Sequence, residues 1–145
     1  MTIHLVSFDI PYPPIYGGII DIYNKIISFK KHGVKVHLHC FQYNDKKESN
    51  ILNSLCDQVD YYPRKSFFKS FYKSVPYIID SRQSEELLSK LIEDDYPILF
   101  EGLHTCFYLN HPSLKNHRKV VWMHNIESDY YHHLGEAEKN IFSKI

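Results

Sequence analysis

Residues 3–41 place two apolar segments on either side of one amphipathic segment, and this order constrains the fold more than any other feature of the chain. Residues 3–8 are a short run of apolar strand formers, which is typical of a buried parallel strand. Residues 18–32 repeat isoleucine and tyrosine at helical spacing and end in basic residues followed by Gly33, as helices commonly do. Residues 34–41 alternate with period two. The three segments together predict a right-handed βαβ unit.

The rest of the chain continues this alternation of strand and helix patterns. Further strands are predicted at 58–62, 97–101 and 119–123. Helices are predicted at 81–95, at 102–110 and from about Ile126, and Asp80 or Ser81 is the expected N-cap of the first of these. The stripe expected to be buried on that helix is Leu87, Leu88, Leu91 and Ile92. These patterns predict an α/β fold with a doubly wound, mostly parallel, Rossmann-like sheet.

At 145 residues the chain has the size of one domain. Its formal net charge is zero, which argues against a nucleic-acid partner. The three cysteines include no C-x-x-C pair, and the N-terminal residues lack the basic start of a signal peptide. The sequence therefore predicts a cytoplasmic location. Because residues 136–145 stop within a helical pattern, we expect the domain at 1–145 to be truncated, with a C-terminal domain absent.

Ligands of an open α/β sheet gather at the carboxyl ends of its strands, so the polar residues there are the candidates for a site. Those that follow the last two predicted strands are Glu101, His104, Thr105, His124, Asn125 and Glu127. After the first strand, Gly17 and Gly18 open a helix whose free N–H groups favour an anion. A tight turn is the simpler explanation for the glycine pair, and the residues alone leave both open.

Several common cofactor motifs are absent from the sequence. Neither the dinucleotide pattern G-x-G-x-x-G nor the Walker pattern G-x-x-x-x-G-K-[ST] occurs. His37 and His39 share one face of a predicted strand next to Cys40, and His132 adjoins His133, but neither group has a known zinc spacing. No metal is therefore predicted.

Residues 64–73 combine lysines on one helical face with aromatic side chains on the other. This pattern is compatible with peripheral contact with an anionic membrane surface at the inner face of the membrane. It is also typical of an ordinary helix that packs its aromatics inward and leaves its lysines in water, which is the simpler explanation. Both interpretations remain open.

The segment PYPPIYGGIIDIYNKIISFKKHGVKVHLHCF resembles the start of family-4-type bacterial glycosyltransferases (glycosyltransferase group 1 type) of the GT-B fold. In that family a proline-rich Gly-Gly loop leads into a helix and then into a second strand. SVPYIIDSR, YPILFEGLHT and VVWMHNIESDYYHHL add to the resemblance, in the family's order. The match extends over most of the chain and is weakest between residues 44 and 73.

The resemblance implies the N-terminal, acceptor-side half of a nucleotide-sugar-dependent enzyme that needs no metal and usually retains the anomeric configuration. The donor-binding half would be missing, so this chain alone is expected to be inactive. By position, Gly17 and Gly18 would face the donor diphosphate, and His124, the catalytic candidate, would lie beside the transferring sugar. The acceptor, a glycan or a lipid-linked sugar, would contact residues drawn from His104, Thr105, Arg82, Asn125 and Glu127.

Two other functions remain open on the sequence. One is a Rossmann-like or flavodoxin-like module that binds another nucleotide or a protein partner, although the missing glycine fingerprint argues against dinucleotides. The other is half of a GT-B enzyme that epimerises sugars. Assembly of a surface polysaccharide is inferred from the kind of relative.

Overall fold

A computed structural model describes residues 1–42, 48–66 and 75–124 of the chain, and its centre is a five-stranded sheet in the order β3-β2-β1-β4-β5. The strands are β1 Thr2–Ser7, β2 Lys35–Gln42, β3 Gln58–Pro63, β4 Ile98–Glu101 and β5 Lys119–Trp122. Every neighbouring pair is parallel. From the central strand β1 the chain first adds β2 and β3 on one side, and then β4 and β5 on the other side. This order confirms the doubly wound, Rossmann-like α/β fold.

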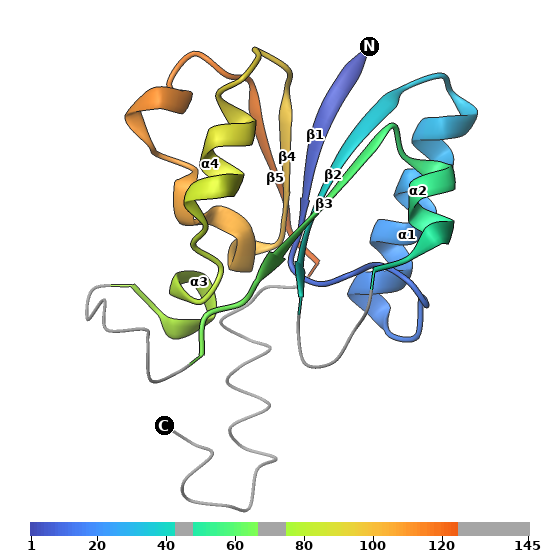
Figure 1. Ribbon diagram of the computed structural model, residues 1–145, viewed down its shortest axis with the longest axis horizontal. Helices are drawn as coiled ribbons and strands as arrows, with labels where there is room; N and C mark the ends of the chain where they lie inside the picture. Colours follow the sequence, from blue (N-terminus) through green and yellow to red (C-terminus); the bar gives the residue numbers. More distant parts are fainter. Residues whose placement is uncertain (43–47, 67–74, 125–145) are drawn as a thin grey trace, which may run out of the picture.

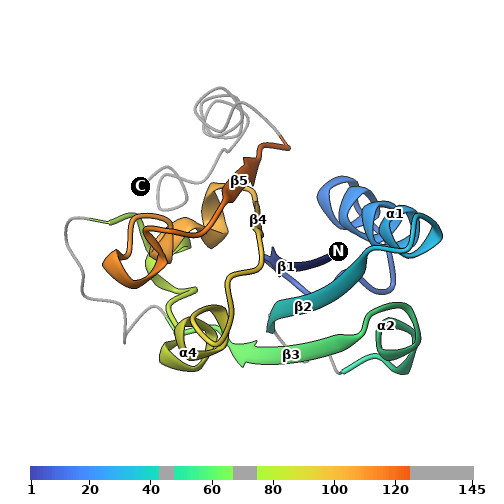
Figure 2. The ribbon, with the colours of Figure 1, turned by 90° about the horizontal axis from the view of Figure 1, so that it is seen from above.

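Helices cover both faces of the sheet, as Figures 1 and 2 show. One face carries α1 Gly17–Lys31 and α2 Asn50–Leu55, and the other carries α4 Glu85–Leu91 with the 3-10 helices η2 Leu103–Tyr108 and η3 Pro112–Leu114. A short helix, α3 Tyr77–Asp80, packs beside η2. The sheet therefore separates two apolar cores, one under α1 and one under α4.

Helix α1 shows why the first βαβ unit was predictable. Ile19, Ile22 and Ile26 point inward and are fully buried, whereas Ile20 and Ile27, which share the same sequence pattern, are about two fifths exposed. The helix ends before Gly33, whose φ of 69° lies in the left-handed region that glycine adopts without strain. The chain can then turn directly into β2.

Helix α4, which corresponds to the helix predicted at 81–95, is shorter than predicted at both ends. The predicted N-cap is wrong. The N-cap of α4 is Ser84, whose hydroxyl accepts a hydrogen bond from the N–H of Leu87 at 3.3 Å. Asp80 instead ends α3, and Ser81 follows it as the C-cap. Arg82 lies between the two helices and is buried, with its Nε donating to the carbonyl of Phe8 at 3.0 Å. Arg82 is thus a buried connection between α3 and α4 rather than part of one long helix.

Ser84→Ala is expected to destabilise the chain by about 1 kcal/mol, because it removes the side-chain acceptor at the start of α4. The melting temperature should fall by roughly 2–4 °C in a thermal unfolding experiment. Ser89→Ala is the matched control, since Ser89 is an exposed position inside the same helix where alanine is favourable. Equal melting temperatures for the two variants would show that the cap contributes nothing.

Other predicted elements are only partly covered by the described residues. The predicted strands at 58–62, 97–101 and 119–123 are confirmed as β3, β4 and β5, and 102–110 contains a 3-10 helix rather than an α-helix. The sequence pattern did not predict α2. The helix expected from Ile126 and most of the amphipathic segment 64–73 lie outside the described residues. Within the described residues, no helix combines the length and the apolar character needed to cross a membrane.

Candidate functional site

A pocket of about 430 Å³ opens at the carboxyl edge of the sheet, between the first turns of α1 and the end of β5. Its lining residues are Gly17, Gly18, Asp21, Trp122, Met123 and His124. The fold therefore brings the glycine pair and His124 together, although more than a hundred residues separate them in the chain. Parallel strands explain this convergence, because their carboxyl ends all lie at one edge.

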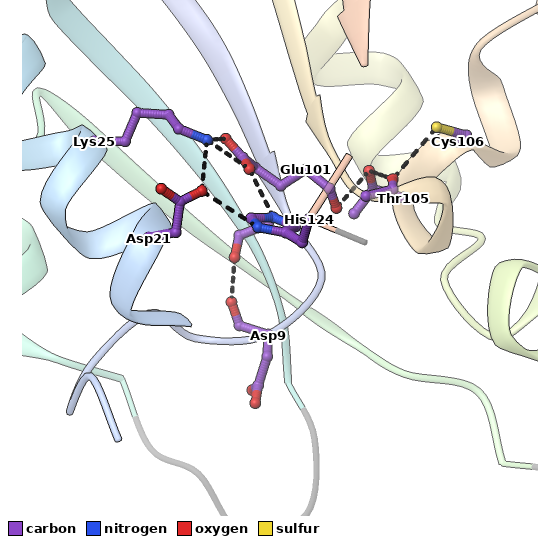
Figure 3. A network of polar contacts seen from close by, with 9 residues as sticks. Asp9, Asp21, Lys25, Glu101, Thr105, Cys106 and His124 are labelled. Carbon is purple, nitrogen blue, oxygen red and sulfur yellow. Dashed lines mark hydrogen bonds and ion pairs between the residues drawn. The ribbon is translucent and has the colours of Figure 1, made fainter. Parts of the chain in front are cut away.

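The wall of the pocket is a network of charged side chains, shown in Figure 3. Glu101, at the end of β4, is fully buried, and both of its carboxylate oxygens accept from Lys25 Nζ, at 2.7 and 2.9 Å. Lys25 also lies 3.3 Å from Asp21 Oδ2, one helical turn earlier, and its ammonium group is 4.4 Å from the centre of the Trp122 ring. Lys25 therefore neutralises a carboxylate that water does not reach.

His124 completes the network. Its Nε2 lies 3.0 Å from Glu101 Oε2, and its Nδ1 lies 3.3 Å from Asp21 Oδ2. His124 Nε2 and Asp21 Oδ2 are nevertheless buried atoms that make no well-aligned hydrogen bond to the described part of the chain. Both atoms therefore face charged partners at ion-pair distance inside the network, while the Asp21 side chain as a whole is about two fifths exposed to the pocket.

The two glycines at the start of α1 have different surroundings. A Cβ atom at Gly18 would lie 2.9 Å from the ring of Phe8, so this position has no room for a side chain. A Cβ at Gly17 would meet nothing within 4 Å. The Phe8 ring also packs edge-on against His124, with 5.7 Å between the ring centres. Gly18 thus allows α1 to approach the end of β1, whereas Gly17 keeps the backbone open to the pocket.

The loop before α1 is held in place by Asp9. Its Oδ1 accepts from the N–H of Ile10 and its Oδ2 accepts from the hydroxyl of Tyr16, both at 2.7 Å. Burial and this hydrogen bond to Asp9 raise the pKa of Tyr16, so the hydroxyl stays protonated and remains a donor. The peptide bond between Tyr12 and Pro13 is cis. These contacts fix the path of the proline-rich loop that leads to the glycine pair.

His104 and Thr105, the acceptor candidates after β4, lie behind the pocket. The ring of His104 packs edge-on against Phe8 at 5.5 Å, and burial, followed by the nearby charge of Arg82, lowers the pKa of His104 to about 4. The imidazole is therefore neutral at pH 7. Thr105 is buried, and its hydroxyl donates to the carbonyl of Gly102 at 3.1 Å, which stabilises the start of η2.

Arg82 is also positioned away from the pocket lining. Besides the carbonyl of Phe8, it donates from Nη1 to the carbonyl of Ile78 at 2.6 Å. These contacts tie α3 to the end of β1. The last two acceptor candidates, Asn125 and Glu127, lie outside the described residues.

Sequence reasoning missed the partners that position His124. Asp21 and Lys25 are four residues apart on α1, just after the glycine pair, and such spacing places both on one face of the helix. This shared face could have indicated that Asp21 and Lys25 belong to the site. An acidic and a basic residue four positions apart on a helix, however, most often form a solvated surface pair. Only the fold shows that this face meets Glu101.

Comparison with known proteins gives one informative match. An uncharacterized 44.6 kDa protein in the cps region of Klebsiella pneumoniae is 30% identical to the chain over 147 residues. The alignment covers 97% of this chain but only 38% of that relative. No described protein family and no solved structure matches the chain.

Proposed function

We propose that this chain is the N-terminal, acceptor-side half of a nucleotide-sugar-dependent glycosyltransferase that takes part in the assembly of a surface polysaccharide. The observation that carries the proposal is the pocket in which the N-terminus of α1 faces His124 at the carboxyl edge of the sheet. The similarity to a protein of a cps region, a capsular polysaccharide region, supports this biosynthetic role. The GT-B architecture and the acceptor-side assignment come from the sequence resemblance.

The start of α1 is suited to the leaving group of such a reaction. Tyr16, the N-cap residue, makes no side-chain hydrogen bond to the first turn, so the N–H groups there are left for another acceptor. Cleavage of the bond between sugar and nucleotide builds negative charge on the diphosphate. A helix N-terminus stabilises that charge through its N–H groups and its dipole.

The opposite wall of the pocket is suited to a sugar. The Asp21 carboxylate and the His124 ring line the pocket and offer polar groups to sugar hydroxyls, and half-exposed Trp122 offers a flat apolar surface to a sugar ring or a base. In the proposed reaction, His124 holds a hydroxyl of the transferring sugar. Glu101 positions His124 from behind through its contact with Nε2, and Lys25 in turn holds Glu101.

The proposed reaction uses no metal in this pocket. The ammonium group of Lys25 already lies between the carboxylates of Glu101 and Asp21, where a divalent cation would otherwise be expected. Charge on the leaving diphosphate is instead stabilised by the helix N-terminus and by the second domain, which we propose to close over the pocket.

The proposal is tested with the protein of the complete reading frame, assayed for release of nucleoside diphosphate from a panel of nucleotide sugars in the presence of glycan and lipid-linked acceptors. His124→Ala should lower the turnover at least ~100-fold, as removal of one preorganised hydrogen-bond donor commonly does. His32→Gln is the control, because His32 lies at the other end of α1 and hydrogen-bonds to Ser28. Equal turnover in the His124 variant would remove this residue from the mechanism.

A further inference from the structure

A second cluster of polar side chains lies near the amino ends of the strands, on the α4 face of the sheet. His4 on β1 is directly opposite His37 on β2, so the two rings project from the same face. Asp94, which follows α4, joins them, and one ligand atom from each of the three residues lies within 4.8 Å of the others. We propose that His4, His37 and Asp94 bind a divalent transition metal, with Zn²⁺ as the best match.

The donor atoms fit this chemistry. Two imidazole nitrogens and a carboxylate oxygen are typical zinc ligands, and three protein ligands leave a fourth position for water. Metal–ligand distances of about 2.0–2.2 Å place the ligands of a tetrahedral ion roughly 3.4 Å apart. The distance between His4 Nε2 and Asp94 Oδ1 is 3.0 Å, so small side-chain rotations open the space that an ion needs.

The ring of His4 is already oriented by a chain of hydrogen bonds. Its Nδ1 lies 2.9 Å from His39 Nε2, and His39 Nδ1 lies 2.8 Å from the hydroxyl of Tyr62. When His4 Nε2 binds a metal, His4 Nδ1–H donates to His39, which in turn donates to Tyr62. The same chain runs in the opposite direction when Nε2–H donates to Asp94. Metal binding therefore leaves the ring nitrogens of His4 and His39 paired. Hydrogen-bond partners behind the metal ligands are typical of metal sites.

The side chains of the two remaining ligands, His37 and Asp94, can turn toward an ion. Within the described residues, His37 makes ring contacts with His4 and Tyr96 but no hydrogen bond through its ring nitrogens. Asp94 Oδ1 accepts a hydrogen bond from the N–H of Tyr96 and also lies within hydrogen-bond distance of His4 Nε2. Its carboxylate is about one quarter exposed, which gives an ion access from water.

The pocket at the other end of the sheet provides an informative contrast. Asp21, Glu101 and His124 have a similar spacing. There, however, Lys25 pairs with both carboxylates and supplies the positive charge itself. In the described part of the chain, no lysine or arginine pairs with Asp94 in this way. The inferred metal site is thus separate from the proposed sugar site and would link β1, β2 and the segment before β4.

The test is titration of the metal-stripped chain with Zn²⁺ by calorimetry, and with Co²⁺ by the visible absorption that tetrahedral coordination produces. One equivalent should bind, and saturation with Zn²⁺ at a hundredfold excess over Kd should raise the melting temperature by roughly 5 °C or more. His37→Gln and Asp94→Asn should each weaken Zn²⁺ binding at least ~10-fold and remove the Co²⁺ absorption.

His111→Gln is the matched control, because His111 caps η3 away from this cluster. It should bind Zn²⁺ as the unchanged chain does. Circular dichroism establishes that the variants are folded before they are compared. The inference is overturned if the unchanged chain binds no Zn²⁺, or if both His37→Gln and Asp94→Asn bind it with unaltered affinity. The second result would place the ion on other histidines.

Discussion

Replacing Lys25 by methionine is expected to lower the free energy of unfolding by about 3–5 kcal/mol, because it leaves the fully buried carboxylate of Glu101 without its main partner. Methionine keeps the length and most of the apolar contacts of the lysine stem, so the loss reports on charge rather than on packing. Urea unfolding measures the free energy directly. In a thermal experiment the melting temperature should fall by roughly 10 °C.

A double variant separates the ion pair from other effects. Lys25→Met combined with Glu101→Gln removes both charges, and the stability should recover by a large part of the loss, since neutral groups cost less to bury. Lys31→Met is the surface control at the end of the same helix and should change stability by less than about 0.5 kcal/mol. A cost below about 1 kcal/mol for Lys25→Met would mean that the buried carboxylate is stabilised by other groups.

Gly17→Leu should abolish sugar transfer by the full-length protein, with a loss of at least ~100-fold, while leaving the fold intact. The physical reason is that a Cβ at Gly17 meets nothing within 4 Å, so the added side chain extends into the pocket instead of into the core. Release of nucleoside diphosphate measures the activity, and thermal unfolding measures the stability.

Gly18→Leu is the matched comparison for that experiment. Its Cβ would lie 2.9 Å from the ring of Phe8, so this variant should lose stability as well as activity. The contrast distinguishes a blocked pocket from a damaged fold. Full activity of Gly17→Leu would show that the loop only connects β1 to α1, and that no ligand approaches it.

Local patterns were sufficient to predict most of the sheet, because the strand segments are short and either largely apolar, as at 3–8, or alternating, as at 34–41. Helix limits were less predictable. The pattern at 81–95 is continuous in the sequence, yet Arg82 lies outside the helix with its Nε bonded to the carbonyl of Phe8, and α4 begins after Ser84. Ser84 followed by Glu85 and Glu86 is a local N-cap signal, but the continuous pattern from residue 81 obscured it.

The candidate site shows the same division between local and distant information. His124 and the glycine pair were predictable, because polar residues and helix starts at strand ends converge in any parallel sheet. The partnership of Lys25 with Glu101 was not, since it joins residues 76 positions apart across a helix and a strand. Thr105 was predicted as an acceptor contact because of its position, while its buried hydroxyl is bonded to the backbone.

The order of the strands also has a consequence for how the protein is made. The central strand β1 is synthesised first, but β4, one of its two neighbours, is completed only at Glu101. While the ribosome is still adding the intervening residues, the emerging βαβ unit has an unpaired central edge, and Lys25 has only Asp21 as a carboxylate partner. Such edges recruit other chains. Until β4 is added, the edge of β1 that is central in the finished sheet stays open to other chains, and Glu101 at the end of β4 then brings Lys25 its second carboxylate.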